Sequence, residues 1–477
     1  MKNTKIVTTI GPSSESKEIL RALAVAGMNV VRLNFSHGEH ESHREIINRV
    51  REVSEELGQP IGILADLQGP RIRIGNEAEL TVSEGSSVRV SDIAHQSESF
   101  SDDTPTIFLD IAGISTSLAA GHQVLIEDGT KRFSVTKRES DAAVIALVET
   151  GGLIKPRKGV NLPDSVLDLP ILSDKDRKDL SFVLKEGVEY VGLSFVGSAA
   201  DIESAREAMR AELPEGARLP EIVSKIERKE AIRNIDEIIK ATDAVMVARG
   251  DLGIEMPESE VTLLQKDIIR RSLMSVKPVI VATQMMKSMT EQPIPTRAEV
   301  SDVTNAVVDH ADAVMLSEES AMGKFPVETV TMMREIIAKT EESPFDDVYG
   351  ALDLNIHSEY AMLIRSVYEL AKSFRARAIL LLSMSGYTAK LASHFRPDTG
   401  ILVATNDRRT YNQLALVWGV RPYLFEGDEK VDSYIDLMVD RAKKDGNLAA
   451  GDQTVVFLGR IPGERDMMRL VGIREIR

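Results

Sequence analysis

Hydrophobic and polar positions alternate in a regular rhythm along most of the first 340 residues of the chain. Short apolar runs of strand length are followed by longer segments whose apolar residues recur at helical spacing. Eight runs predict buried strands, at residues 5–11, 30–35, 61–67, 190–196, 221–227, 244–250, 278–284 and 313–319. Eight strand–helix units in series favour a closed (β/α)8 barrel of the TIM type. A doubly wound open sheet is the alternative, although no GxGxxG motif opens a helix in the sequence.

The segments between the predicted strands carry helix signals. Residues 13–27 (SSESKEILRALAVAG) combine a Ser cap, helically spaced apolar residues and Gly27 as a terminator. Residues 228–242 and 296–311 predict comparable helices after the fifth and the seventh strand. The helices therefore support the βα repeat on which the barrel prediction depends.

More than a hundred residues separate the third and fourth predicted strands, far beyond a normal connection. Residues 71–156 within this gap predict β structure, including a DG turn. We expect an inserted small β-barrel domain that emerges at the active face of the barrel and acts as a lid. The strand–helix rhythm restarts after residue 341. The expected organisation is a catalytic barrel (1–70 and 157–340), a β lid domain (71–156) and a C-terminal α/β regulatory domain (341–477).

Composition narrows the classes of function. The chain has 477 residues, of which 43% are hydrophobic and 28% charged, as in globular proteins. It has no cysteine, which excludes disulfides and thiolate metal sites and suits a reducing compartment, so we expect a cytoplasmic location. No apolar run has membrane-spanning length, and the first residues predict a strand rather than a signal peptide. The net charge of −16 argues against nucleic acids and membrane surfaces as partners, so an anionic substrate needs a locally positive pocket.

Charged and polar residues gather at the carboxyl ends of the predicted strands, where barrels of this kind carry their chemistry. In the segment 222–227 (IVSKIE), Lys225 and Glu227 lie two positions apart and share one face of a buried strand. Other strand ends contribute Arg32, Asn34, Ser36, Asp66, Arg249, Asp251, Thr283, Ser317 and Glu319. Because many strands deliver polar groups to one rim, we expect this rim to be a functional site.

These residue types suit metal-assisted chemistry. Glu227 and Asp251 offer two carboxylates, and Mg²⁺ commonly takes one or two carboxylates together with waters and substrate oxygens. Lys225, Arg32 and Arg73 add a cationic cradle for a phosphoryl group, whose transfer depends on positioning and charge neutralisation. The sequence has no Walker motif and no kinase-type HRD or DFG set, so a nucleotide needs another mode of binding. The residues by themselves predict metal-assisted chemistry on a phosphorylated anion.

Long, ordered stretches of the chain resemble pyruvate kinases. They are TKIVTTIGPSS, MNVVRLNFSHG, LADLQGPRIRIG, KGVNLPD, IVSKIE, VMVARGDLGIE, VIVATQMMKSM, PTRAEVSDVTNAV and LSEESAMGKFP, and they spread through the whole predicted barrel. The inserted and C-terminal domains are similar to those of the family in placement and length. The resemblance implies the last step of glycolysis, in which a phosphoryl group passes from phosphoenolpyruvate to ADP. ATP and an enolate are formed, and the enolate is protonated to pyruvate.

The resemblance implies roles for the residues at the rim. Glu227 and Asp251 would hold a divalent cation, Mg²⁺ or Mn²⁺, that bridges the substrate's carboxylate, enolate oxygen and phosphoryl group. Lys225 would neutralise charge on the phosphoryl group in flight. Arg32 would contact phosphoryl oxygens, with Arg73 close by.

The resemblance also implies positions for the enolate and the nucleotide. Thr283 would lie near the face of the enolate that receives the proton, with Ser317 in a relay of hydroxyl groups and water. The substrate carboxylate would be seated on backbone N–H groups around Ala248, Arg249 and Gly250. The nucleotide would lie toward Pro12, Asn34, His37, Arg73 and Lys158.

One departure from the family concerns K⁺. Members that need K⁺ hold it with the equivalents of Asn34, Ser36 and Asp66, and many carry Thr at the position of Leu67 and Glu at that of Arg71. Leu67 lacks the hydroxyl group, and Arg71 replaces a carboxylate by a fixed cation that could stand in for the ion electrostatically. The resemblance therefore indicates the potassium-independent subgroup, in which K⁺ is not required.

The predicted C-terminal domain carries a candidate effector site. Residues 383–386 (SMSG) follow a buried strand and open a helix, where hydroxyl and free N–H groups suit an anion, although an ordinary helix cap is the alternative. In the family the comparable loop binds the phosphate of a sugar-phosphate activator. An effector, either a sugar phosphate or a nucleotide, would therefore contact Ser383, Ser385, Gly386 and Thr388. The Arg-rich segment 458–473 could complete the pocket, and the family implies a homotetramer.

Two rival functions stay open on sequence alone. A Schiff-base or metal-dependent aldolase or lyase would use Lys225 as its nucleophile, although a lysine beside a carboxylate stays protonated. A catalytically silent regulatory or binding protein would use the same scaffold, against which the intact set of acidic, basic and metal-binding residues argues. Borohydride trapping with a keto acid tests the first function, and an ATP-formation assay tests the second.

Overall fold

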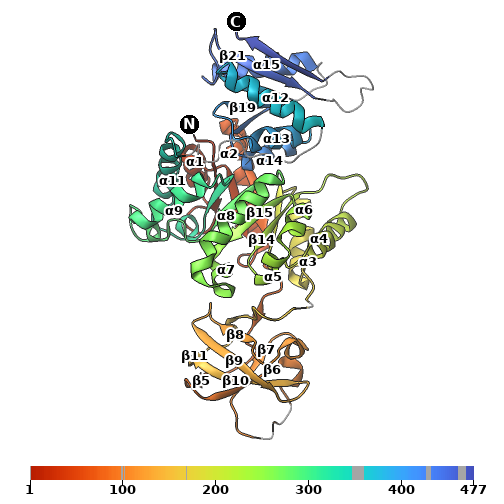
Figure 1. Cartoon of the computed structure of the whole chain (residues 1–477), viewed down its shortest axis with the longest axis vertical. Coiled ribbons are helices and arrows are strands. Elements are labelled where there is room, and N and C mark those ends of the chain that lie inside the picture. Colours follow the sequence, from red (N-terminus) through yellow and green to blue (C-terminus); the bar gives the residue numbers. More distant parts are fainter. Residues whose placement is uncertain are drawn as a thin grey trace.

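The computed structural model describes residues 2–97, 100, 102–167, 169–345, 359–425, 431–459 and 469–477. The chain is elongated, with the inserted β domain at one end, the barrel in the middle and the C-terminal domain at the other end (Figure 1). Among the helices of these described residues, none is long and apolar enough to cross a bilayer.

Eight parallel strands close into a barrel, which confirms the predicted (β/α)8 fold and excludes the open sheet. Their order around the barrel is β1-β17-β16-β15-β14-β13-β3-β2. The strands are β1 (Lys5–Thr9), β2 (Val30–Asn34), β3 (Gly62–Asp66), β13 (Tyr190–Leu193), β14 (Glu221–Ile226), β15 (Ala244–Ala248), β16 (Val279–Ala282) and β17 (Ala313–Leu316). Because all eight strands are parallel, their carboxyl ends meet at one rim.

Helices surround the barrel, as the apolar spacing predicts. The predicted start and stop of the first helix are confirmed, because Ser16 accepts the Ile19 N–H and Gly27 ends the helix at φ +131°, a backbone conformation that favours glycine. The barrel helices are α1 (Lys17–Ala26), α2 (His40–Leu57), α3 (Asp174–Lys185), α4 (Ala199–Glu212), α5 (Lys229–Arg233), α6 (Ile235–Ala241), α7 (Arg249–Glu255), α8 (Glu258–Met274), α9 (Arg297–Val308), α10 (Glu318–Ala321) and α11 (Pro326–Glu341).

The single helix predicted over residues 228–242 is wrong, since the structure has the two short helices α5 and α6 there. The break lies at Asn234, whose backbone leaves the helical region at φ −104° and ψ 17°. The Asn234 side chain donates to the Gly197 carbonyl at 2.8 Å. A contact with a distant loop therefore overrides the helical periodicity.

The inserted segment forms a seven-stranded sheet of order β4-β12-β8-β9-β10-β6-β7 and a two-stranded sheet of β11 and β5. A bridge between Ile74 and Leu109 joins the two edges of the larger sheet, so that this sheet curls on itself. Val160 pairs with Ile126 and Ile72, which carries the sheet to Asn161, beyond residue 156. The strands are β4 (Ile72–Arg73), β5 (Leu80–Val82), β6 (Ser87–Asp92), β7 (Thr106–Leu109), β8 (Gln123–Ile126), β9 (Lys131–Arg138), β10 (Ala143–Thr150), β11 (Gly152–Ile154) and β12 (Gly159–Asn161).

The C-terminal domain is a five-stranded sheet of order β20-β19-β18-β21-β22 with helices, as the α/β prediction requires. Its last strand, β22, runs antiparallel to β21, while the other pairs are parallel. The elements are α12 (Glu359–Ser373), β18 (Ala378–Leu382), α13 (Tyr387–His394), β19 (Gly400–Thr405), α14 (Arg408–Gln413), β20 (Val420–Leu424), α15 (Val431–Lys444), β21 (Gln453–Leu458) and β22 (Leu470–Glu475).

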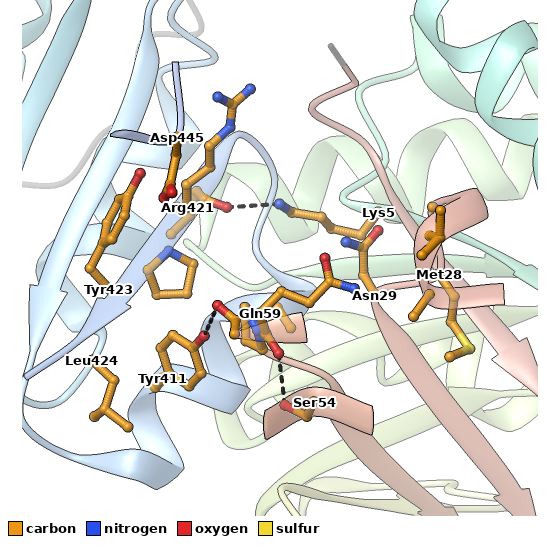
Figure 2. Close-up of a pocket in the computed structure, with 18 of the residues that line it drawn as sticks. Lys5, Met28, Asn29, Ser54, Gln59, Tyr411, Arg421, Tyr423, Leu424 and Asp445 are labelled. Atoms are coloured by element: carbon orange, nitrogen blue, oxygen red, sulfur yellow. Dashed lines mark hydrogen bonds between the residues drawn. The ribbon is translucent and has the colours of Figure 1, made fainter. Parts of the chain in front are cut away.

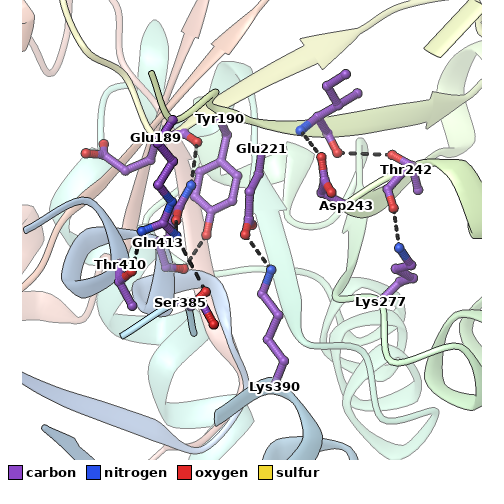
Figure 3. Close-up of polar contacts among 12 residues, drawn as sticks. Glu189, Tyr190, Glu221, Thr242, Asp243, Lys277, Ser385, Lys390, Thr410 and Gln413 are labelled. Atoms are coloured by element: carbon purple, nitrogen blue, oxygen red, sulfur yellow. Dashed lines mark hydrogen bonds and ion pairs between the residues drawn. The ribbon is translucent and has the colours of Figure 1, made fainter. Parts of the chain in front are cut away.

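Polar contacts join this domain to the amino-terminal end of the barrel, opposite the rim that carries the candidate site. Lys390 on α13 pairs with Glu221, the first residue of β14, at 2.6 Å (Figure 3). The Tyr190 hydroxyl on β13 donates to the Gln413 carbonyl. Two barrel strands are therefore anchored directly to the C-terminal domain.

A cleft of about 820 Å³ lies between the same end of the barrel and the C-terminal domain (Figure 2). Lys5 is 7% exposed beside it and donates from Nζ to the Val420 carbonyl at 2.8 Å. Burial lowers the pKa of Lys5 to about 7, and the Arg421 guanidinium adds to this shift, while the Glu341 carboxylate opposes it. A lysine whose pKa lies close to neutral pH is therefore found at the junction of two domains.

We expect this buried lysine to make stability depend on pH. The pKa of Lys5 is about 7 in the folded chain and about 10.4 when unfolded, so between these values the unfolded state binds more protons and stability rises with pH. Relative to a Lys5→Met variant, the parent should gain on the order of 2–4 kcal/mol from about pH 7 to about pH 10. Calorimetry of both proteins at the two pH values measures this gain, and a stability difference that stays constant contradicts the prediction.

Candidate active site

Four charged side chains from β2, β3 and β14 meet at the carboxyl-terminal rim of the barrel. Arg32 pairs with Asp66, with its Nε and Nη2 each 2.7 Å from Asp66 Oδ2. Lys225 Nζ lies 3.2 Å from Asp66 Oδ1 and 2.9 Å from Glu227 Oε1. Positive and negative charges therefore alternate in a row, which we call the charged row: Arg32, Asp66, Lys225 and Glu227.

Strand β13 lies between β3 and β14, and small residues let the charges meet across it. Asp66 is in register with Gly192, where a Cβ atom would lie only 3.0 Å from Asp66 Oδ1. Ser194 follows β13, and its Oγ accepts from Lys225 Nζ at 2.8 Å and donates to the Leu67 carbonyl at 2.7 Å. Ser194 was not among the residues predicted for the site, although it is a polar residue near the end of a predicted strand, as are the residues that were predicted.

The two carboxylates of the charged row are buried and its two cations are largely so, so burial and neighbouring charges compete in setting the pKa values. Asp66 and Glu227 are 1% and 2% exposed. Burial alone would lower the pKa of Lys225, but the carboxylates of Asp66 and Glu227 outweigh it and raise this pKa. Burial would raise the pKa of Asp66, but Lys225 and Arg32 outweigh it and lower this pKa. Lys225 is therefore a fixed ammonium group, which suits an anion clamp and argues against a Schiff-base nucleophile.

Glu227 and Asp251 form the acidic part of the rim. Burial raises the pKa of Glu227 to about 7, where Lys225 opposes the shift and the charge of Asp251 adds to it. Glu227 Oε2 accepts the Phe195 N–H at 2.7 Å, and Asp251 lies in the first turn of α7, beside a cavity of about 360 Å³. The mutual repulsion of two nearby carboxylates and their hard oxygen atoms fit a divalent cation.

The small number of acidic side chains at the rim also indicates which kind of metal ion could bind there. Among the residues that the structure describes, no group of three or more His, Cys, Asp and Glu side chains is placed to hold a metal. Mg²⁺ commonly takes only one or two carboxylates and completes its octahedron with waters and substrate oxygens. Glu227 and Asp251 therefore fit a site that substrate completes.

The ends of β15, β16 and β17 complete the rim. Thr283 follows β16 at φ +69°, and its Oγ1 accepts the Gly250 N–H at 2.8 Å. Ala248 ends β15, while the guanidinium of the next residue, Arg249, is engaged by Asp302 on α9 and by the Thr283 carbonyl. Only the backbone of Arg249 is therefore available to a substrate. The Ser317 N–H, after β17, donates to Glu319 Oε2 at 2.7 Å.

The residues expected at a monovalent-cation site lie together at the ends of β2 and β3. Asn34 is in register with Asp66, and its Oδ1 accepts the Ser36 N–H at 3.1 Å. Leu67 is 2% exposed and has no side-chain oxygen.

Two of the residues expected to contact the nucleotide, Pro12 and His37, are exposed in the loops after β1 and β2.

Three basic residues expected near the rim lie in or beside the inserted domain and make their contacts there. Arg71 lies 3.7 Å from Asp128, and Lys158 lies 2.8 Å from Glu127. Arg73 donates to a backbone carbonyl at 3.1 Å. The positions of these three positive charges therefore depend on the position of the inserted domain. The cations that contact Asp66 are Arg32 and Lys225 of the charged row.

The candidate effector loop has the expected strand–turn–helix form. Ser383 is buried after β18, Gly386 precedes α13 at φ +79°, and Thr388 is buried in the first turn of the helix. Ser385 is exposed at the turn. Residues 460–468, most of the Arg-rich segment expected to complete this site, lie outside the described residues.

Comparisons with known proteins agree with the geometry. The model of the pyruvate kinase barrel domain matches residues 1–330, and that of the pyruvate kinase alpha/beta domain matches residues 361–471. A pyruvate kinase of Agrobacterium vitis is 41% identical over 464 residues, covering 96% of this chain and 95% of that protein. One of Geobacillus stearothermophilus is 38% identical over 482 residues, covering 100% of this chain and 80% of that protein. A solved structure of a pyruvate kinase from Cryptosporidium parvum covers 100% of this chain and 96% of its own, with a TM-score of 0.91 and 32% identity. The chain belongs to the pyruvate kinase family.

Proposed function

We propose that the chain carries out the reaction of its family at the rim that holds the charged row. As a phosphotransferase of this family it moves the phosphoryl group of phosphoenolpyruvate to ADP, giving pyruvate and ATP. The observation that supports this site is the largely buried ammonium of Lys225 between Asp66 and Glu227. Fixed cations in a water-poor site stabilise the charge on a transferring phosphoryl group without reorganising.

Glu227 and Asp251 are the residues that we propose to hold the divalent cation that family membership implies, with Mg²⁺ or Mn²⁺ as candidates. When bound, such a cation neutralises and polarises the oxygen atoms of the substrate. Glu227 is oriented for this role by the Phe195 N–H. The backbone N–H groups around Gly250 would seat the substrate carboxylate beside these two side chains.

Lys225 and Arg32 would bind the phosphoryl oxygens during the transfer. Ser194 and Asp66 hold the Lys225 ammonium at 2.8 and 3.2 Å, so the ammonium stays in place when Glu227 takes another partner. Thr283 would lie at the face of the enolate that receives the proton, with Ser317 in the relay. The adenine nucleotide would lie toward Pro12, Asn34, His37, Arg73 and Lys158.

The direct test is a coupled ATP-formation assay on the purified chain. We expect ATP only when phosphoenolpyruvate, ADP and a divalent cation are present together. ATP formation no faster than in the absence of the enzyme would favour a silent scaffold instead.

We also propose that activity does not require K⁺. Leu67 offers no hydroxyl ligand, and Arg32 and Lys225 already neutralise Asp66. Exchange of K⁺ for a tetraalkylammonium ion at constant ionic strength should change kcat less than about twofold, because fixed cations already supply the charge. The assay above measures this ratio, and a rate that rises many-fold with K⁺ refutes the proposal.

The loop at residues 383–386 is proposed to bind a phosphorylated activator. Its support is the chain of contacts from the loop to β14: Arg218 Nη2 lies 3.5 Å from the Ser385 carbonyl, and Lys390 pairs with Glu221 on the same barrel strand as Lys225. We expect one of a panel of sugar phosphates and AMP to lower the KM for phosphoenolpyruvate. Saturation curves that none of these ligands changes would contradict this role.

Assembly and location are proposed from family membership. The family is usually tetrameric, so we propose a homotetramer. We propose a cytoplasmic location for the same reason, in agreement with the absence of cysteine from the sequence.

A further inference from the structure

The segment that follows β16 holds two consecutive residues in the left-handed region of the backbone. Thr283 has φ +69° and Gln284 has φ +56°. This conformation is unfavourable for a β-branched residue such as threonine, and it persists only where the surroundings hold the backbone in place. Since Thr283 Oγ1 also accepts the Gly250 N–H, whatever holds this segment also sets the geometry of the rim.

The side chain of Arg249 holds this segment in place. Its Nη2 donates to the Thr283 carbonyl at 2.7 Å, and its Nε lies 3.4 Å from the Ala282 carbonyl. Arg249 is also the first residue of α7, two positions before Asp251. One guanidinium therefore ties the strained end of β16 to the helix that carries a proposed metal-binding carboxylate.

Asp302 on α9 fixes this guanidinium in turn. Its Oδ1 and Oδ2 accept from Nη1 and Nη2 of Arg249, each at 2.7 Å. Such a bidentate pair sets the orientation of the guanidinium plane, and the Arg249 side chain is only 12% exposed, so water competes little. We propose that Asp302 is a positioning residue of the reaction, which acts through Arg249 on Thr283 and on Asp251.

Replacement of Asp302 by asparagine should lower kcat while the protein stays folded. An Asp302→Asn variant keeps the shape of the side chain but presents one oxygen and one amide to the guanidinium, so the second bond is lost. The strained segment is then free to relax, and a displacement of about 1 Å at a reacting centre can cost about 10²-fold in rate. We expect kcat to fall by about 10- to 100-fold.

The experiment compares Asp302→Asn with the parent in kcat, in the KM for phosphoenolpyruvate and in the Kd for Mn²⁺ without substrate. We expect the fall in kcat to exceed any change in KM, and the Kd for Mn²⁺ to rise several-fold because α7 carries Asp251. A matched control is Asp267→Asn, which disturbs the pairs of Asp267 with Arg270 and Arg271 on α8 and should leave all three quantities within about twofold.

The role inferred for Asp302 rests on the role proposed for Thr283. A double variant tests the two roles separately. In the Thr283→Ala background, Asp302→Asn should lower kcat less than it does in the parent, because the two residues act along one path. If Thr283→Ala alone is fully active, the role of Thr283 is wrong, while a raised Kd for Mn²⁺ in Asp302→Asn still supports positioning through α7.

Two results overturn the inference. One is an Asp302→Asn variant whose kcat and Kd for Mn²⁺ both stay within about twofold of the parent values. The other is an equal effect of Asp302→Asn in the parent and in the Thr283→Ala background, together with an unchanged Kd for Mn²⁺. If Asp302→Asn fails to fold, Arg249→Lys carries the same test, since it keeps a cation beside Asp302 and loses the bond to the Thr283 carbonyl.

Discussion

Replacement of Lys225 by methionine is expected to lower kcat by about 10³-fold, the largest loss of any single substitution outside the metal ligands. The methionine fills a similar volume, but it removes one of the two fixed cations, Lys225 and Arg32, that we propose to face the charge that develops on the phosphoryl group. The KM for phosphoenolpyruvate should change much less, because the ammonium acts mainly on the transition state. Steady-state kinetics with saturating divalent cation measure both quantities.

Lys277 offers a matched control for this substitution. It is another partly buried lysine of the barrel, but it lies at the opposite end and donates to the Thr242 carbonyl (Figure 3). A Lys277→Met variant should keep kcat within about threefold. A Lys225→Met enzyme that retains more than a tenth of the parent kcat would show that the ammonium is not a principal source of the rate. A borohydride-trapped adduct of Lys225 with a keto acid would favour the lyase instead.

Replacement of Glu227 by glutamine should weaken the binding of Mn²⁺ by about 10²-fold and lower kcat by about 10²- to 10³-fold. The amide is nearly isosteric and its oxygen can still accept the Phe195 N–H, so the local backbone keeps its support. What the variant loses is the negative charge, one of only two carboxylates proposed for the cation. Titration of the substrate-free protein with Mn²⁺, followed by electron paramagnetic resonance, measures the affinity directly.

Glu255 is the control for this second prediction. It lines the same cavity as Asp251 and is partly buried, but its oxygens accept the Lys229 N–H at 3.0 Å and the Asn161 amide at 3.2 Å. A Glu255→Gln variant should bind Mn²⁺ within about threefold of the parent. Equal affinities of Glu227→Gln and the parent would show that the metal is held elsewhere.

The fold was predictable because its signals are local. Each barrel strand is a short apolar run that stands out from the sequence, and each helix has its own periodicity and caps, as Ser16 and Gly27 show. The break between α5 and α6 was not predictable, because it depends on a contact between Asn234 and Gly197, which belong to different βα units. The strand β12 was missed for the same reason, since its partners lie in β4 and β8.

Membership of the rim follows from the sequence, because period 2 in a strand and the parallel order of a barrel place residues such as Lys225 and Glu227 at one end. Only the tertiary structure decides which of these side chains meet. It places Ser194 beside Lys225, pairs Arg249 with Asp302 on α9, and pairs Lys158 with Glu127 in the inserted domain. These partners are far apart in the chain, and their choice depends on the packing of several elements at once, which no local pattern encodes.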